Sequence, residues 1–526
     1  MTIRTSNNPR RTLFLVALVA ALCICWYLTP TSTVGLFQNS LKLALLSGLV
    51  ALPLSSLLAF FMARFEIPGR RFIDGCLLVL LLMPLYVQLA AWEAGFGRGG
   101  WYSTLIAEQL SDPPLEGLRG SVWVHAMAAI PWLYGVFRLG LESIPSTYED
   151  AARIDGSAWQ VFRHVTLPLT LPVFVGGALF VGIVTMTEIT VTDRYQFRSY
   201  AEVIYSEFAL GFDKLPVEIA SVPLNLAMLV LVGLSFCVLT GGRLVHATPN
   251  SRRQRLKTTQ PWPFAFVIVM IMMLLGVPLA NLLYQAGIEV EQIGDQRHRV
   301  WSFSKCVSLI AKSPISYQEE LAWTAVLSQL SILSSISIAT LWAWWSHGRK
   351  IRQWIGLVIC VICFATPGTL ISLAIMRTLN HPNSLMIWLY DDTLAAPWLA
   401  LTIKCLPFAC LLLWQGMRTI PQSVLDAARI DGASSISTFW RIVLPLLRPN
   451  IICAALICLA VSIGELSASL LVLPPSVTTV SKRIFSLIHY GAEDQLAGLC
   501  LSCVIVMMCL SWATRAAIGG LSRSQL

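Results

Sequence analysis

Apolar stretches recur along the whole chain with short polar segments between them, and each approaches the roughly 20 residues that a helix needs to cross a bilayer. A membrane barrel would instead show shorter segments of alternating polarity, so the pattern predicts helices. Twelve stretches qualify, at 12–28, 41–63, 72–92, 120–141, 171–189, 219–240, 263–283, 321–345, 354–376, 394–416, 449–471 and 495–514. The alternative for one or two of them is a buried or re-entrant helix.

The composition agrees with this pattern. Hydrophobic residues make up 56% of the chain and charged residues 12%, whereas a soluble domain carries roughly 25% charged residues. We therefore predict an all-α polytopic membrane protein. The first stretch is expected to be retained, because the Tyr-Leu-Thr-Pro at 27–30 lacks the small residues of a signal-peptide cleavage site and further spans follow at once.

Lysine and arginine are distributed unevenly between the loops. With the N-terminus in the cytoplasm, most of the 37 Lys and Arg lie on the cytoplasmic side, as the positive-inside rule requires. We expect both termini and the segments 147–168, 243–260 and 418–448 in the cytoplasm, and 285–318 and 380–392 outside. The net charge of +9 is thus a consequence of topology and gives no reason to expect nucleic-acid binding.

The chain contains an internal repeat. The heptapeptide DAARIDG occurs at 150–156 and again at 426–432, and its flanks "FRHVTLPLTLP" (162–172) and "FWRIVLPLLRP" (439–449) also match, with one residue fewer in the first copy. Each copy stands between the fourth and fifth span of a six-span half, so the halves are parallel repeats. We expect a first half at 1–245, a basic cytoplasmic linker at 246–262 and a second half at 263–526.

Each copy has the local signals of a short helix. Pro145 and Pro421 prevent the preceding span from continuing. Thr147-x-x-Asp150 and Ser423-x-x-Asp426 fit capping boxes, which places the two carboxylates in the first turn. Gly156 and Gly432 suit a left-handed helix end. So short a helix is not stable alone in water, which favours a partner protein that holds it; the alternative is packing on its own bundle.

The pattern Asp-Ala-Ala, three residues, Gly, then Leu-Pro resembles the EAA loop of ABC-importer permeases. The loops span 147–168 and 423–445, and the resemblance covers the chain from about residue 40 onwards. It implies a type I ABC importer permease fold and two ABC ATPase subunits, each docked on one loop. The ATPase-coupling residues that it implies are Asp150, Ala151, Ala152, Gly156, Leu167, Pro168, Asp426, Ala427, Ala428, Gly432, Leu444 and Pro445. The first copy has a shorter spacing than the usual pattern. This departure affects the match of the second helix of that copy.

The sequence contains no Gly-x-x-x-x-Gly-Lys-Ser/Thr phosphate loop. We therefore expect a chain that is not an enzyme and binds no cofactor, with ATP used by the partner subunits. The pairs Cys360-x-x-Cys363 and Cys500-x-x-Cys503 lie in apolar stretches, without the polar groups that orient metal-binding thiolates. We interpret them as packing residues; the alternative is a metal site or a disulfide.

Two acidic residues stand at equivalent positions of the repeat. Glu188 and Glu465 each follow their Leu-Pro proline by twenty residues, which puts them near the outer end of a span. An ionisable residue at membrane depth suggests function, so we predict that both line a translocation path; the alternative is an interfacial Glu satisfied by water and loop residues. His125 and His381 are interpreted as structural.

The leading functional hypothesis is the permease subunit of an ATP-driven importer in the cell inner membrane, supplied by an external substrate-binding protein. Fused two-half permeases of this kind resemble the ferric-iron, thiamine and phosphonate importers, and residues 464–501 look most like the ferric-iron group. An acidic outer mouth, which includes Glu289, Asp391 and Asp494, favours a cation. Another class, an ion-coupled secondary transporter, would need more intramembrane charge and no paired docking helices. We found no constellation for a membrane enzyme.

Overall fold

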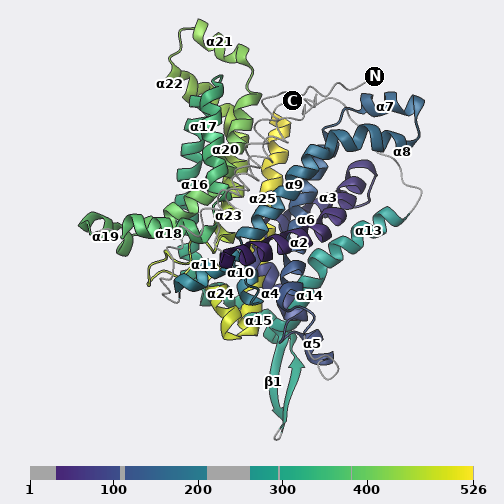
Figure 1. Cartoon of the computed structure of the whole chain (residues 1–526), viewed down its shortest axis with the longest axis vertical. Coiled ribbons are helices and arrows are strands. Elements are labelled where there is room, and N and C mark those ends of the chain that lie inside the picture. Colours follow the sequence, from purple (N-terminus) through teal and green to yellow (C-terminus); the bar gives the residue numbers. More distant parts are fainter. Residues whose placement is uncertain (1–30, 107–112, 210–260, 294–295, 381, 525–526) are drawn as a thin grey trace.

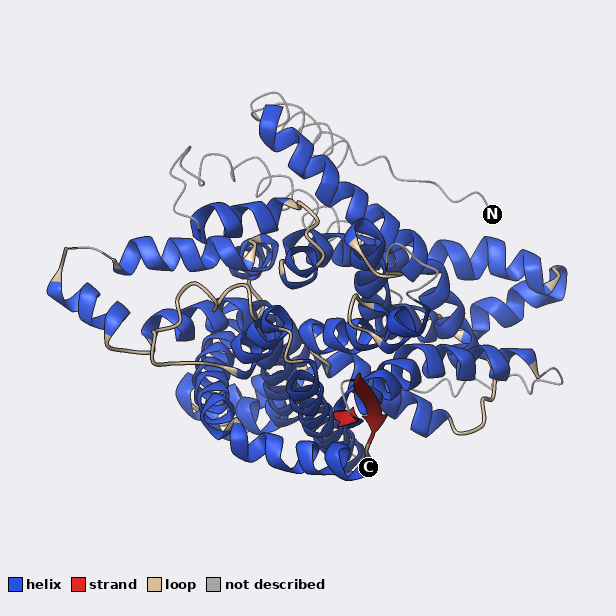
Figure 2. Ribbon diagram, turned by 90° about the horizontal axis from the view of Figure 1, so that it is seen from below, coloured by secondary structure: helices blue, strands red, loops and turns tan. Residues whose placement is uncertain are grey.

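The computed structural model describes residues 31–106, 113–209, 261–293, 296–380 and 382–524. Within these ranges the elements are helices, apart from one antiparallel hairpin of β1 (Ile288–Ile293) and β2 (Gln296–Trp301), red in Figure 2 among the blue helices. The all-helical prediction is thus confirmed apart from this hairpin. The predicted spans 12–28 and 219–240, and the linker up to residue 260, lie outside the described residues.

The helices follow the order of the repeat. In the first half they are α2 (Thr31–Arg64), α3 (Arg70–Leu82), α4 (Leu85–Phe96), α5 (Trp101–Ile106), α6 (Gly117–Glu142), α7 (Ser146–Asp155), α8 (Ala158–Val161), η1 (Phe162–Thr166), α9 (Leu167–Thr187), α10 (Thr190–Arg194) and α11 (Tyr200–Ala209). In the second they are α13 (Trp262–Ile271), η2 (Met272–Gly276), α14 (Val277–Gly287), α15 (Phe303–Ser316), α16 (Gln318–Ser346), α17 (Lys350–Ala365), α18 (Gly368–Leu379), α19 (Ser384–Asp391), α20 (Ala395–Thr419), α21 (Gln422–Ile430), α22 (Ser435–Thr438), η3 (Phe439–Val443), α23 (Leu444–Gly464), α24 (Val480–Tyr490) and α25 (Glu493–Ser524). The η elements are π-helical turns.

In the described part of the chain, eight helices are long and apolar enough to cross a membrane. The number of candidate spans rises to ten if each of two bent helix pairs counts as one span. The bent pairs replace the straight spans predicted at 72–92 and 354–376. Helices α3 and α4 meet at 102°, and α17 and α18 at 103°. The cause is Pro84 and Pro367, because a proline forces the residue before it out of the helical region: Met83 has ψ 122° and Thr366 has ψ 123°.

The two halves use the same packing and are interleaved. Helix α2 packs along α6 and α9, and α16 packs along α20 and α23 in the same way. However, α14 and α25, which belong to the second half by sequence, pack on α4 of the first. One apolar core therefore holds buried side chains from both halves, including Leu89, Leu282 and Leu499.

The molecule has two distinct ends (Figure 1). Helices α7 and α8 of the first half and α21 and α22 of the second lie at one end, which we call the α7/α21 end. The β1–β2 hairpin projects from the opposite end, the hairpin end. The predicted sidedness is consistent with this arrangement, because 147–168 and 418–448 share one end and the segment with the hairpin lies at the other.

Candidate docking helices and a shared cavity

Helices α7 and α21 begin immediately after Pro145 and Pro421, both extended with ψ 134°. Thr147 and Ser423 are therefore already the second residues of their helices, and neither helix start has a side-chain cap. The predicted capping boxes are wrong, because an N-cap residue must itself be non-helical. Asp150 and Asp426 consequently lie beyond the first turn, and Asp426 pairs with Arg429 at 3.1 Å.

The two glycines of the repeat differ in conformation. Gly432 has φ 76°, the left-handed end that we predicted, but Gly156 has φ −142° and is extended. The cause is the missing residue of the first copy. Ser157, which follows Gly156 directly, is the N-cap of α8 in a true capping box with Gln160, whereas Ala433 separates Gly432 from the equivalent cap, Ser434. The second short helix forms in both copies.

This difference gives a first testable prediction. Gly432→Ala should lower the stability of the purified protein by about 1 kcal/mol, because a left-handed backbone disfavours a Cβ atom. Gly156→Ala should cost less, since φ −142° is open to any residue; the new Cβ would lie 3.3 Å from Ala152 O, a tight contact that a small shift relieves. Thermal unfolding in detergent compares the two variants directly. Equal losses of stability would contradict the different backbone conformations assigned to the two glycines.

The remaining loop residues lie at the base of the same elements. Leu167 and Pro168 begin α9, and Leu444 and Pro445 begin α23, each directly after a π-helical turn. A proline has no N–H to continue an α-helical ladder, and the wider turn precedes it in both copies. The loops therefore have equivalent geometry from the short helix onwards.

The exposed side of each candidate docking helix, α7 and α21, carries an isoleucine. Ile154 is 84% exposed and Ile430 is 86% exposed, the highest values among the large hydrophobic residues that the structure describes. They are equivalent in the repeat. Ala151 and Ala427 are exposed, whereas Ala428 is buried. Sequence reasoning missed the two isoleucines, although an apolar residue inside a repeated polar heptapeptide was the available signal.

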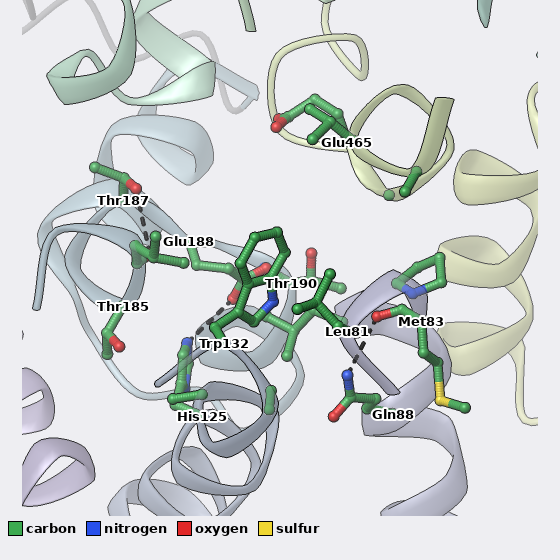
Figure 3. Close-up of a pocket in the computed structure, with 18 of the residues that line it drawn as sticks. Leu81, Met83, Gln88, His125, Trp132, Thr185, Thr187, Glu188, Thr190 and Glu465 are labelled. Atoms are coloured by element: carbon green, nitrogen blue, oxygen red, sulfur yellow. Dashed lines mark hydrogen bonds and ion pairs between the residues drawn. The ribbon is translucent and has the colours of Figure 1, made fainter. Parts of the chain in front are cut away.

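A cavity of about 260 Å³ lies between the halves. Both predicted path residues line it, Glu188 after the end of α9 and Glu465 after the end of α23 (Figure 3). Their equivalence in the sequence repeat is thus matched by a shared location in the structure. Lys404 also lines the cavity, and its Nζ donates to the carbonyl oxygen of Thr366 at 3.0 Å.

Each carboxylate accepts hydrogen bonds from the turn that follows it. Glu188 accepts from the backbone N–H of Thr190 at 2.6 Å and of Val191 at 3.0 Å. Glu465 accepts from Ser467 Oγ at 2.8 Å and from the N–H of Ala468 at 2.9 Å. Both residues therefore terminate one helix and cap the next turn while they face the cavity.

His125 contributes to the same site, although sequence reasoning treated it as only structural. It is buried on α6, its Nδ1 lies 2.7 Å from Ser121 O, and its Nε2 lies 3.5 Å from Glu188 Oε2 (Figure 3). The histidine thus places an imidazole nitrogen beside the carboxylate. His381, the other histidine considered, lies outside the described residues.

Aromatic rings form much of the remaining wall. Phe180 of α9 stacks on Phe364 of α17 at a centroid distance of 5.4 Å, which joins the two halves. Trp132 contacts Phe180 at 5.8 Å, and Phe408 contacts Phe364 at 6.0 Å. All four line the cavity. No sequence signal predicted this group, because its members come from four different helices.

The turn capped by Glu188 is also fixed to the second half. In α10, Arg194 pairs with Glu93 at 2.7 Å and donates to the carbonyl oxygen of Ile488. Asp193 lies 3.0 Å from His489 Nε2, and this hydrogen bond raises the pKa of His489 above its usual value. The loop after Glu188 is therefore held in place from two sides.

The cysteines give no sign of a metal centre in the described part of the chain. Cys360, Cys363, Cys500 and Cys503 are free thiols, three of them buried. No group of three or more His, Cys, Asp or Glu side chains within the described ranges is arranged to hold a metal ion. The interpretation of these cysteines as packing residues stays a prediction.

The chain matches the family described as "Binding-protein-dependent transport system inner membrane component" over residues 51–194 and 335–524. Each matched region contains one candidate docking helix, α7 or α21, and one cavity glutamate. The chain is also similar to the molybdenum transport system permease protein ModB of Escherichia coli (strain K12), with 31% identity over 141 residues, which cover 27% of this chain and 62% of ModB.

A second relative is the maltose/maltodextrin transport system permease protein MalG of the same strain, with 30% identity over 154 residues, 29% of this chain and 49% of MalG. The matches thus span about half to three-fifths of the relatives' own lengths. The family match itself extends over more than half of this chain. The protein is therefore a member of the family of inner membrane components of binding-protein-dependent transport systems, a multi-pass permease that is not itself catalytic.

Proposed function

We propose that this chain is the transmembrane subunit of an ATP-driven ABC importer, with one ATPase subunit docked on α7 and another on α21. The observation that carries the proposal is the pair Ile154 and Ile430, two apolar side chains left almost fully exposed at equivalent positions of polar helices. A large apolar side chain that is left exposed on a polar helix is typical of an anchor residue that inserts into a pocket of a partner protein. An external binding protein delivers substrate at the hairpin end.

Sidedness follows from this proposal and can be tested independently. In a cysteine-free background, a cysteine at 154 should react with a thiol reagent only when the reagent reaches the cytoplasm. A cysteine at 300, on β2, should react in intact cells once the outer membrane is permeable. The positive-inside distribution predicts this result; labelling of residue 154 from outside would invert the topology and place both termini outside.

We further propose that the substrate is a cation and that ferric iron is the first candidate. The support is the likeness of residues 464–501 to ferric-iron permeases and the two carboxylates that line the cavity. Carboxylate oxygens suit a hard cation, and two of them disfavour an anion such as a phosphonate. The relatives' names refer to molybdenum and to maltose, so the family alone leaves the substrate open.

Thiamine is the second candidate, and a specific observation favours it. The rings of Trp132, Phe180, Phe364 and Phe408 line a cavity that two carboxylates also line, and an aromatic wall suits a flat organic cation. Uptake of labelled iron and labelled thiamine by cells with and without this chain decides between the two. Loss of thiamine uptake with intact iron uptake would overturn the iron assignment and leave the importer assignment in place.

Transport by the purified protein separates the importer from an ion-coupled secondary transporter. We expect the purified chain in proteoliposomes to transport nothing until the ATPase, ATP and the binding protein are added. Uptake driven by an ion gradient without ATPase subunits would favour the secondary transporter instead.

A further inference from the structure

The first docking helix is attached to the bundle through one buried carboxylate. Glu149 is the only buried residue of α7. Its Oε1 and Oε2 accept from the Arg64 guanidinium at 2.6 and 2.9 Å, and Oε1 also accepts from Thr166 Oγ1 at 2.9 Å. Arg64 is the last residue of α2, and Thr166 is the last residue of η1 before α9. Glu149 therefore joins α7 to the ends of two membrane helices.

The second half has apolar residues at the three equivalent positions. The heptapeptide offset places Leu425 opposite Glu149, and the offset of the Leu-Pro pairs places Val443 opposite Thr166. Ala343 corresponds to Arg64, because each stands five residues before a glycine with positive φ, Gly69 at 67° and Gly348 at 71°. Ala343, Leu425 and Val443 are buried in one apolar cluster.

The two junctions thus connect the same three elements by different forces. In the first half, two charges and a hydroxyl are buried and satisfy one another, an arrangement that depends on all its members because a buried charge without its partner is strongly unfavourable. In the second half, contact between apolar side chains holds the corresponding three elements together without directional bonds. A complete exchange of a buried ion pair for apolar residues is often tolerated, whereas removal of one partner is not.

We propose that Arg64, Glu149 and Thr166 form a polar junction that transmits movement of the first docking helix to α2 and α9, and that Ala343, Leu425 and Val443 form its apolar counterpart for the second. The transmission role rests on the proposed importer function; the mechanical attachment does not. Glu149 is thereby a positioning residue for α7, and the docking surface around Ile154 points away from it.

The test compares Glu149→Leu with the triple variant Arg64→Met/Glu149→Leu/Thr166→Val, which recreates the apolar chemistry of the second half. A nitroxide label at residue 154, in a cysteine-free background, reports the mobility of α7 without any ATPase present. In Glu149→Leu, the distribution of distances between this label and a second label at residue 57 on α2 should broaden. In the triple variant, the distribution should return to that of the wild type. A label at residue 430 on α21 is the control, and neither variant should change its mobility.

Transport per ATP hydrolysed, in proteoliposomes with ATPase and binding protein, then tests transmission. Glu149→Leu should still bind the ATPase through Ile154 but lose at least tenfold in transport per ATP, and the triple variant should return to within threefold of wild type. The junction would be overturned if Glu149→Leu left both the label distances and the transport per ATP unchanged. It would also be overturned if the triple variant restored neither quantity relative to the single variant. If the ATPase fails to bind even the wild-type chain, the proposed function fails, and the label result still decides the attachment.

Discussion

Replacement of Ile154 and Ile430 with serine is expected to abolish assembly of the permease with its ATPase subunits. A central apolar anchor in an interface contributes about 2 kcal/mol or more, which corresponds to roughly 30-fold weaker binding at each site. Because the two sites hold a pair of subunits together, the loss of both should exceed either single loss. Co-purification of the ATPase with the tagged permease, and its stimulation by substrate-loaded binding protein, measure the effect.

A matched control is available on the same molecule. Ile351 on α17 is 77% exposed, and α17 lies outside the docking helices, so Ile351→Ser should leave assembly unchanged. Each single variant should weaken only its own site and retain partial assembly. Full assembly of the double variant would mean that the exposed isoleucines are not anchors and that the docking role of α7 and α21 is wrong.

The sequence carried enough information for the membrane helices and for the repeat. Long apolar stretches are a strong signal because a span must bury nearly all of its backbone and side chains in lipid or protein. The bends at Pro84 and Pro367 could have been predicted too, since a proline inside an apolar stretch marks a break. The β1–β2 hairpin was missed because its strands lie in a polar segment that topology alone assigned to a loop.

The local geometry of the repeat was harder to predict than its existence. Identical residues led us to expect identical caps and identical glycine conformations, yet Gly156 is extended and Gly432 is left-handed. Because the first copy lacks one residue, its glycine directly precedes the N-cap serine of the next helix, whereas an alanine separates the two in the second copy. This difference determines the backbone conformation of the glycine. Thr147 and Ser423 matched a capping pattern by spacing, but the proline two residues earlier sets where the helix begins.

The site itself was partly predictable. Glu188 and Glu465 were found because both stand at the same distance from a repeated proline, and the structure places both on one cavity. The aromatic wall and His125 depend on contacts between helices that are far apart in the sequence, such as Phe180 with Phe364. One sequence without tertiary contacts gives no reason to select those rings from the other aromatic residues.

The double variant Glu188→Gln/Glu465→Gln is expected to lower uptake of a cationic substrate by more than about tenfold while assembly with the ATPase is retained. Glutamine keeps an acceptor oxygen for the N–H groups of Thr190 and Ala468, so the capped turns should persist. It removes two negative charges from the cavity, and a charge pair at about 4 Å is worth roughly 4 kcal/mol at an effective dielectric constant of 20.

Alanine at the same positions separates capping from charge. Glu188→Ala and Glu465→Ala remove the acceptor as well and should lower thermal stability, because backbone N–H groups of the following turn lose their partners. Uptake and thermal unfolding of the glutamine and alanine pairs are measured together. Wild-type uptake in the glutamine double variant, with a loss confined to the alanine variants, would show that the two carboxylates serve the fold and leave the path to the aromatic wall and His125.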